Sequence, residues 1–92
     1  MVAKDIEEKI NRDFELPDEA ALVLSVLGDF ADRHPDLSSD RILRCIVFVA
    51  DGDMGVLEKA MDLARLDFRD LIMWAEYDGN DNRTRDLTLP FS

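Results

Sequence analysis

The sequence predicts an all-α fold, a single small domain of four to five short helices in an irregular or orthogonal packing around a central buried helix at about 39–51. Three observations predict it. Apolar residues recur at helical spacing, the few Gly and Pro residues separate the apolar segments, and a chain of 92 residues allows one modest core. We therefore treat residues 1–92 as one helical domain, with residues 79–92 as a loop and docking tail.

A narrow apolar stripe in a charged segment predicts the first helix, which ends before Pro17. The stripe consists of Val2, Ile6, Ile10 and Phe14. Pro17 suits the first turn of a second helix, because its fixed φ is helical and the N–H that it lacks is not needed there. The second helix should end near Arg33, because Pro35 disfavours helical backbone at the residue before it.

The third helix is predicted to lie at the centre of the domain. Ser38 or Ser39 is a suitable N-cap, and the run from Ile42 to Ala50 is apolar almost all the way round. A helix of that kind has to be covered on every side. Cys45 is the single cysteine and lies in this run, so a buried, unreactive thiol is expected.

Residues 53–77 are predicted to form either one helix or two. Their apolar residues alternate at spacings of three and four, which is typical of one continuous helical seam. The seam consists of Met54, Leu57, Met61, Ala64, Phe68, Leu71 and Ala75. A single helix of about 25 residues would span nearly 40 Å, more than so small a domain readily covers. Because Asp67 would serve as a second N-cap, we favour a break at Leu66–Asp67.

The segment that starts at Asp51 has the first two ligands of an EF-hand calcium loop, but the rest of the loop does not follow. Its fifth position is Gly55, which lacks a side-chain oxygen, and its twelfth is Asp62 rather than a bidentate glutamate. We expect Asp51 and Gly52 to end one helix and Asp53 to cap the next. Calcium binding at Asp51, Asp53 and Asp62 is therefore only the third functional hypothesis.

Composition limits the partners that the chain can have. There are 21 acidic and 11 basic residues, which give a formal net charge of −10. Such a charge repels nucleic acids and anionic membrane surfaces. No apolar run approaches the roughly 20 residues of a membrane span, and the first residues lack the apolar core of a signal peptide. With one cysteine and no internal disulfide, we expect a cytoplasmic protein without nucleic-acid or membrane partners.

The sequence offers no recognisable catalytic constellation. His34 is the only histidine, in an exposed-looking turn, and the one thiol is expected to be buried, so no nucleophile and base can be paired. Phosphate-binding glycine loops and Cys/His metal clusters are missing as well. Among the carboxylates, Glu58 and Glu76 are expected to be partly buried. We predict that the protein is not an enzyme and has no cofactor.

Four arginines form a candidate anion-binding site, which is the alternative function. They are Arg41, Arg44, Arg65 and Arg69. On helices, the three-residue spacing of the first two and the four-residue spacing of the last two bring like charges together. A carboxylate or phosphate ligand between the guanidinium groups would relieve that repulsion. The chain's own aspartates would do the same, and this internal pairing is the interpretation we favour.

The leading hypothesis is a non-catalytic protein–protein interaction or self-association module, with a homodimer as the first choice and another protein as the alternative partner. The last helix already has a full apolar stripe, yet further large apolar residues point to its other sides. Trp, Tyr and Met are enriched at the centres of interfaces. The candidate interface residues are Met73, Trp74, Tyr77 and, in the tail, Phe91. Alternatively, the first helix or the tail covers them within one chain.

Overall fold

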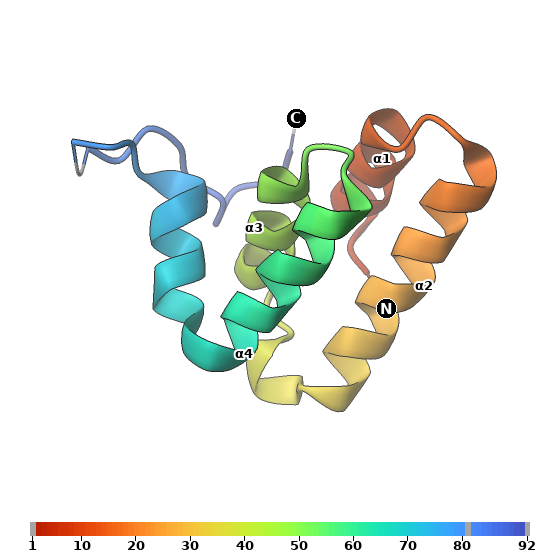
Figure 1. Ribbon diagram of the computed structural model, residues 1–92, viewed down its shortest axis with the longest axis horizontal. Helices are drawn as coiled ribbons and strands as arrows, with labels where there is room; N and C mark the ends of the chain where they lie inside the picture. The colour runs from red at the N-terminus through yellow and green to blue at the C-terminus, as the bar shows by residue number, and fades with distance from the viewer. Residues whose placement is uncertain (1, 81, 92) are drawn as a thin grey trace.

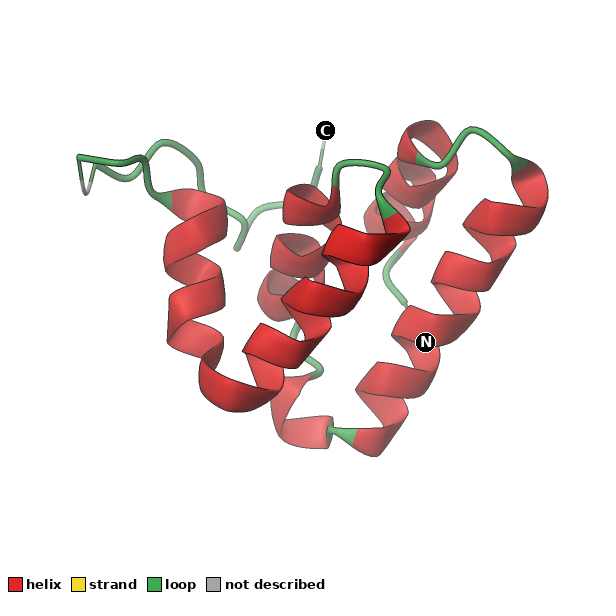
Figure 2. Cartoon of the chain, viewed as in Figure 1, coloured by secondary structure: helices red, strands yellow, loops and turns green. Residues whose placement is uncertain are grey.

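The computed structural model describes residues 2–80 and 82–91, and within these residues the prediction of an all-α fold is confirmed. The elements are α1 (Lys4–Asp13), α2 (Pro17–Arg33), the 3-10 helix η1 (Pro35–Leu37), α3 (Asp40–Ala50) and α4 (Met54–Glu76). Helix α3 lies between α1 and α4, and α2 packs along α1 (Figure 1). Loops that join the helices are short, and the longest stretch outside a helix follows α4 (Figure 2).

Helices α1 and α2 start and end close to where the sequence predicts. The apolar stripe of α1 is buried, since Ile6 and Ile10 have no exposed surface and Phe14 is only 1% exposed. Pro17 occupies the first turn of α2, and the helix ends at Arg33, before Pro35. The narrow stripe on α1 is therefore a true core face, although the rest of that helix is charged.

Helix α3 is the centre of the core. The hydroxyl of Ser39 accepts a hydrogen bond from the N–H of Ile42 at 3.3 Å, so Ser39 is the N-cap. The buried residues of α3 are Ile42, Leu43, Arg44, Cys45, Ile46, Val47 and Ala50. Burial raises the pKa of the Cys45 thiol to about 12, which keeps it protonated and unreactive. The one charged residue in this set, Arg44, requires an explanation of its own.

The corner between α3 and α4 has the capping arrangement that the sequence predicts. Asp51 adopts the left-handed conformation with φ 47°, and Gly52 follows with φ 81°. The carboxylate of Asp53 then accepts hydrogen bonds from the N–H groups of Gly55 (2.8 Å) and Val56 (3.2 Å). The two residues that resemble calcium ligands in the sequence therefore have structural roles: the backbone of Asp51 ends α3, and the carboxylate of Asp53 starts α4.

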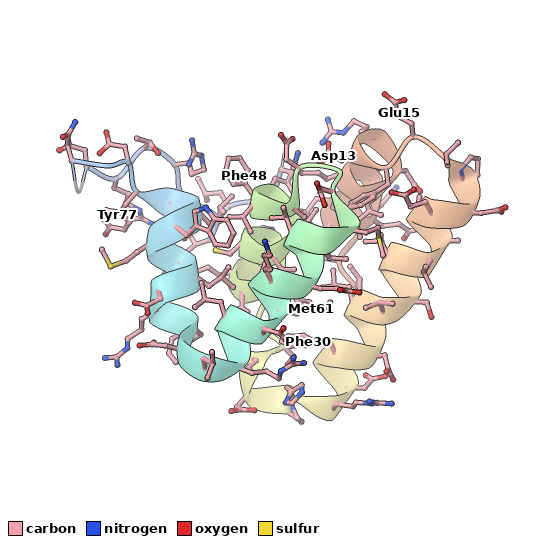
Figure 3. The ribbon with its side chains drawn as sticks, viewed as in Figure 1. Asp13, Glu15, Phe30, Phe48, Met61 and Tyr77 are labelled. Atoms are coloured by element: carbon pink, nitrogen blue, oxygen red, sulfur yellow. The ribbon has the colours of Figure 1, made fainter. Side chains whose placement is uncertain are left out.

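Helix α4 bends at Asp67, where φ is −158° and ψ is 99°, so the predicted break at Leu66–Asp67 is confirmed. The side chain of Asp67 accepts a hydrogen bond from the N–H of Arg69 at 3.0 Å and starts the second half of the helix. Phe68 is 43% exposed, so its assignment to the continuous apolar seam was wrong. The seam assumed unbroken helical phase, and the bend interrupts that phase one residue earlier. Figure 3 shows Phe30 and Met61, both buried, in the space between α2 and α4.

Two glycines provide a test of the backbone geometry. Gly28 lies within α2, and a Cβ added there would meet no atom within 4 Å. Gly28→Ala should therefore raise the free energy of unfolding by about 0.5–1 kcal/mol, because glycine loses more backbone entropy on folding. At Gly52, with φ 81°, a Cβ would lie 2.6 Å from the carbonyl oxygen of Asp13. Gly52→Ala should lower stability by at least about 1 kcal/mol. Urea denaturation measures the free energy of unfolding of both variants. A Gly52→Ala variant that is more stable than the Gly28→Ala variant would contradict this geometry.

Candidate interaction surface

The second half of α4 has apolar residues on both its inner and outer sides. Leu71 and Ala75 have no exposed surface and pack into the core, whereas Met73 and Trp74 are 48% and 47% exposed. Tyr77, partly buried, follows directly after the helix and lies on its outer side in Figure 3. Helical spacing brings these last three residues to one side, largely opposite the buried stripe. We call Met73, Trp74 and Tyr77 the outer face of α4.

Phe91, the fourth candidate interface residue, lies elsewhere and contacts α1. Its ring is partly buried, and the ammonium group of Lys9 lies 5.3 Å from the ring centroid. The backbone N–H of Phe91 donates a hydrogen bond to Asp5 Oδ2 at 3.1 Å. The structure therefore brings three of the four predicted interface residues together, while Phe91 holds the tail against the body of the protein.

A polar turn leads from α4 into the tail. Asp78 Oδ1 accepts hydrogen bonds from the N–H groups of Asn80 (2.8 Å) and Asn82 (3.0 Å), and these bonds hold the pKa of Asp78 below its usual value. An isolated antiparallel bridge pairs Tyr77 with Arg83. In Figure 1 this turn extends away from the helices before the chain returns to α3. We call residues 82–91 the C-terminal strap.

The first part of the strap is held at the end of α4. The carbonyl oxygen of Glu76 accepts hydrogen bonds from the N–H groups of Thr84 (2.7 Å) and Arg85 (3.3 Å). The guanidinium group of Arg85 donates to the carbonyl oxygen of Ala75 at 2.5 Å and lies 4.3 Å from the centroid of the Phe48 ring on α3. These contacts satisfy carbonyl groups that the end of a helix leaves without partners.

The second part of the strap is held by Arg44, whose burial this contact explains. Arg44 is 5% exposed, and it donates hydrogen bonds to the carbonyl oxygens of Leu87 (3.4 Å) and Thr88 (3.3 Å). Its other nitrogen atoms donate to Asp5 Oδ2 at 2.9 Å and Oδ1 at 3.2 Å. Leu87 is itself 5% exposed. The hydrogen bonds from Arg44 hold the pKa of Asp5 below its usual value, against the opposing effect of burial.

Glu76 is the buried acid that organises the start of the strap. It has no exposed surface, and Arg41 donates to both of its carboxylate oxygens, at 2.8 Å and 2.9 Å. Arg83, from the strap, donates to Oε1 at 3.1 Å and also pairs with Asp86 at 3.0 Å. Burial alone would raise the pKa of Glu76, but the hydrogen bonds and charges of Arg41 and Arg83 outweigh it and lower the pKa.

Ion pairs within the chain account for all four arginines of the candidate anion site. Arg41 pairs with Glu76 and Arg44 with Asp5, on different elements. Arg65 pairs with Asp62, and Arg69 pairs with Asp67 at 3.3 Å. Internal pairing is the interpretation that the sequence favoured, although Glu76, Asp5 and Asp67 were not among the acids expected to provide it. The four side chains therefore bind four different carboxylates.

Of the four arginines, Arg65 and Arg69 line a common hollow, which has a volume of about 510 Å³. Asp36 and Asp67 line the same hollow, so two acids face two bases there. This local balance of charge removes the excess of positive charge on which the anion-binding hypothesis depended.

Sequence reasoning found part of this arrangement. It predicted that the tail docks and that Glu76 and Glu58 are partly buried, whereas Glu76 is fully buried and Glu58 is exposed. It missed the partners Asp5, Arg83 and Arg85, because each lies in a charged segment that resembles ordinary surface. The one available signal was Glu76 itself, a single acid between Ala75 and Tyr77 in an apolar segment.

His34 and Cys45, the remaining candidates for chemical reactivity, both lie in packed surroundings. The ring of His34 lies 5.1 Å from that of Phe30, and Cys45 is fully buried. Among residues 2–80 and 82–91, no three His, Cys, Asp or Glu side chains lie together as a metal site would require. Within the same residues, no helix combines the length and the apolar character needed to cross a membrane.

No known family model matches the sequence, and no similar chain was found among curated proteins or solved structures.

The Glu76 cluster predicts unequal effects of removing its two charges. Arg41→Met leaves a fully buried carboxylate with Arg83 alone, so we expect a loss of about 3 kcal/mol in the free energy of unfolding. Glu76→Gln leaves two guanidinium groups whose side chains are 37% and 43% exposed and can bind water, so we expect about 1.5 kcal/mol. Urea denaturation at pH 7 measures both. Equal losses would mean that Glu76 is better hydrated than its burial indicates.

The lowered pKa of Asp5 predicts a pH dependence of stability. In the unfolded chain its pKa returns to the usual value near 4, so the unfolded state takes up a proton first. The stabilisation is complete above that value and is lost as the pH falls through the lower pKa of the folded state. Urea denaturation should therefore show a stability difference between the wild-type protein and Asp5→Asn that is largest at pH 7 and smaller at pH 3. A difference that does not change with pH would contradict the ion pair with Arg44.

Proposed function

We propose that this protein is a non-catalytic, cytoplasmic interaction module that forms a homodimer through the outer face of α4. The observation that carries the proposal is the exposure of Met73 and Trp74 on a helix whose opposite side is fully buried. A helix that is apolar on two sides is typical of one that is covered on two sides. Within the described residues, the chain covers only one of them.

The composition of the outer face supports a protein partner. Trp and Tyr supply large contact areas at a small cost in side-chain entropy, and Met adapts to irregular surfaces. These residue types dominate the energetic centres of interfaces. The three residues adjoin one another on one helical turn and the residue after it, so a partner can bury them together. A second copy is the simplest partner, because one surface then serves both sides of a twofold contact.

Electrostatics set the conditions under which the dimer should form. Two copies with a net charge of −10 each repel one another, and salt screens that repulsion. The acids beside the outer face, Asp70 and Asp78, are both exposed. Association should therefore strengthen with rising salt concentration, the opposite of a contact that depends on ion pairs between unlike charges.

Substitution of Trp74 tests the proposal. We expect sedimentation at micromolar to millimolar protein and 0.5 M NaCl to give the mass of two chains, and Trp74→Ala to weaken the dimer by at least about 30-fold, as for a residue at an interface centre. The matched control is Leu22→Ala, which removes a side chain that is 53% exposed but lies on a different helix, α2. The mass of a single chain throughout this range, or equal effects of the two substitutions, would contradict the homodimer.

A further inference from the structure

The distal part of the strap, residues 87–91, binds elements other than α4, from which the strap departs, and we call its binding site on α1 and α3 the groove. The strap leaves α4 through the turn that Asp78 forms with Asn80 and Asn82, yet its distal part binds Asp5 and Lys9 of α1 and Arg44 of α3. None of these three contacts depends on the path by which the strap arrives. The groove would make the same contacts with the strap of any copy of the chain.

The contacts in this groove resemble those by which proteins bind extended peptides. Arg44 donates to two main-chain carbonyl groups, and Asp5 accepts a hydrogen bond from a main-chain N–H. Leu87 is a buried apolar side chain of the strap, 5% exposed, and Phe91 is a second, partly buried anchor. Main-chain hydrogen bonds together with spaced apolar anchors are a general mode of peptide recognition.

We propose that two copies of this protein associate by reciprocal exchange of residues 82–91, so that the strap of each copy occupies the groove of the other. The inference rests on the proposed function, because it supplies the means by which the homodimer assembles. The exchange also explains the position of the outer face. Met73, Trp74 and Tyr77 directly precede the turn, and an opened turn brings these residues of two copies to the point where the chains cross.

The free energy of exchange depends on two changes, the loss of the turn and the burial of the outer face. Contacts between strap and groove are the same within one chain and between two, so they cancel. The exchange loses the bonds of the turn, chiefly those that Asp78 accepts from Asn80 and Asn82, all of which are exposed. It gains the burial of the outer face. Because the strap of the same chain has a high effective concentration, the dimer should form slowly and depend on protein concentration.

Mixing two full-length variants tests the exchange directly. Leu87→Ala and Arg44→Met are each expected to release the strap from the groove, so a strap–groove pair that carries both substitutions is no weaker than a pair that carries one. With exchange, a dimer of one copy of each contains an intact strap in an intact groove, so we expect the mixture to associate at least ten-fold more tightly than either variant alone. Sedimentation with one variant fluorescently labelled measures this. Without exchange, each strap meets only its own groove, and association in the mixture equal to the average of the two variants would overturn the proposal.

Deletion of residues 79–82 provides a second test that does not require Arg44→Met to fold. The shortened chain cannot return to its own groove, so we expect the mass of two chains with helical content retained, and a roughly 30-fold weaker dimer when Leu87→Ala is added. The control carries six inserted Gly and Ser residues in the same turn and should associate no more tightly than the wild-type chain. A folded single chain from the deletion variant would overturn the exchange.

The two proposals can fail separately. If the wild-type protein is a dimer that Trp74→Ala weakens, but the mixed variants show no gain, the outer face stands and the exchange is wrong. If the mixed variants gain affinity while Trp74→Ala changes nothing, the exchange stands and the outer face is not the interface.

Discussion

The charge of Glu76 has to be neutralised inside the protein, and the arrangement of the last third of the chain depends on how this happens. A carboxylate without exposed surface is costly unless it is paired and fully hydrogen-bonded. Arg41 approaches it from α3 and Arg83 from the strap. Glu76 thus fixes the end of α4 against the central helix and the start of the strap against both.

Arg44 fixes the distal part of the strap, as Glu76 fixes its start. The two arginines of α3 lie one helical turn apart, and each reaches a carboxylate on a different element, Glu76 on α4 and Asp5 on α1. Helix α3 is therefore central in two ways. Its apolar side chains fill the core, and its two cations join the helices on either side of it through ion pairs in each of which one partner, Glu76 or Arg44, is buried.

The sequence predicted what depends on local rules and core patterning. Pro17, Ser39, Asp53 and Asp67 each start a helix for reasons that their nearest neighbours determine. The burial of α3 followed from its composition. What could not be predicted was the choice of partner for each charge, because 21 acids and 11 bases allow many pairings and only the fold decides between them. Asp5 and Phe91, for example, are 86 positions apart.

Phe68 shows the limit of a periodic pattern for the same reason. Its spacing from Ala64 and Leu71 fits a seam, but the hydrogen bonds that start a new helix at Asp67 change the direction of the chain. The exposure of Met73 and Trp74 was better predicted, since both lie within one uninterrupted helical segment. Helical spacing predicted side-chain positions correctly within one helical segment, but not across the N-cap at Asp67.

The contact between Asp5 and Phe91 also has a consequence for the order of folding. Closing a loop that includes nearly the whole chain is entropically unfavourable until the helices between its ends have packed. The strap should therefore bind last during folding and detach first during unfolding. For a short interval, every newly folded molecule would have packed helices, an empty groove and a free strap. In a crowded solution that interval sets whether the chain closes on itself or meets another copy first, so the rate of synthesis as well as the equilibrium would influence the oligomeric state.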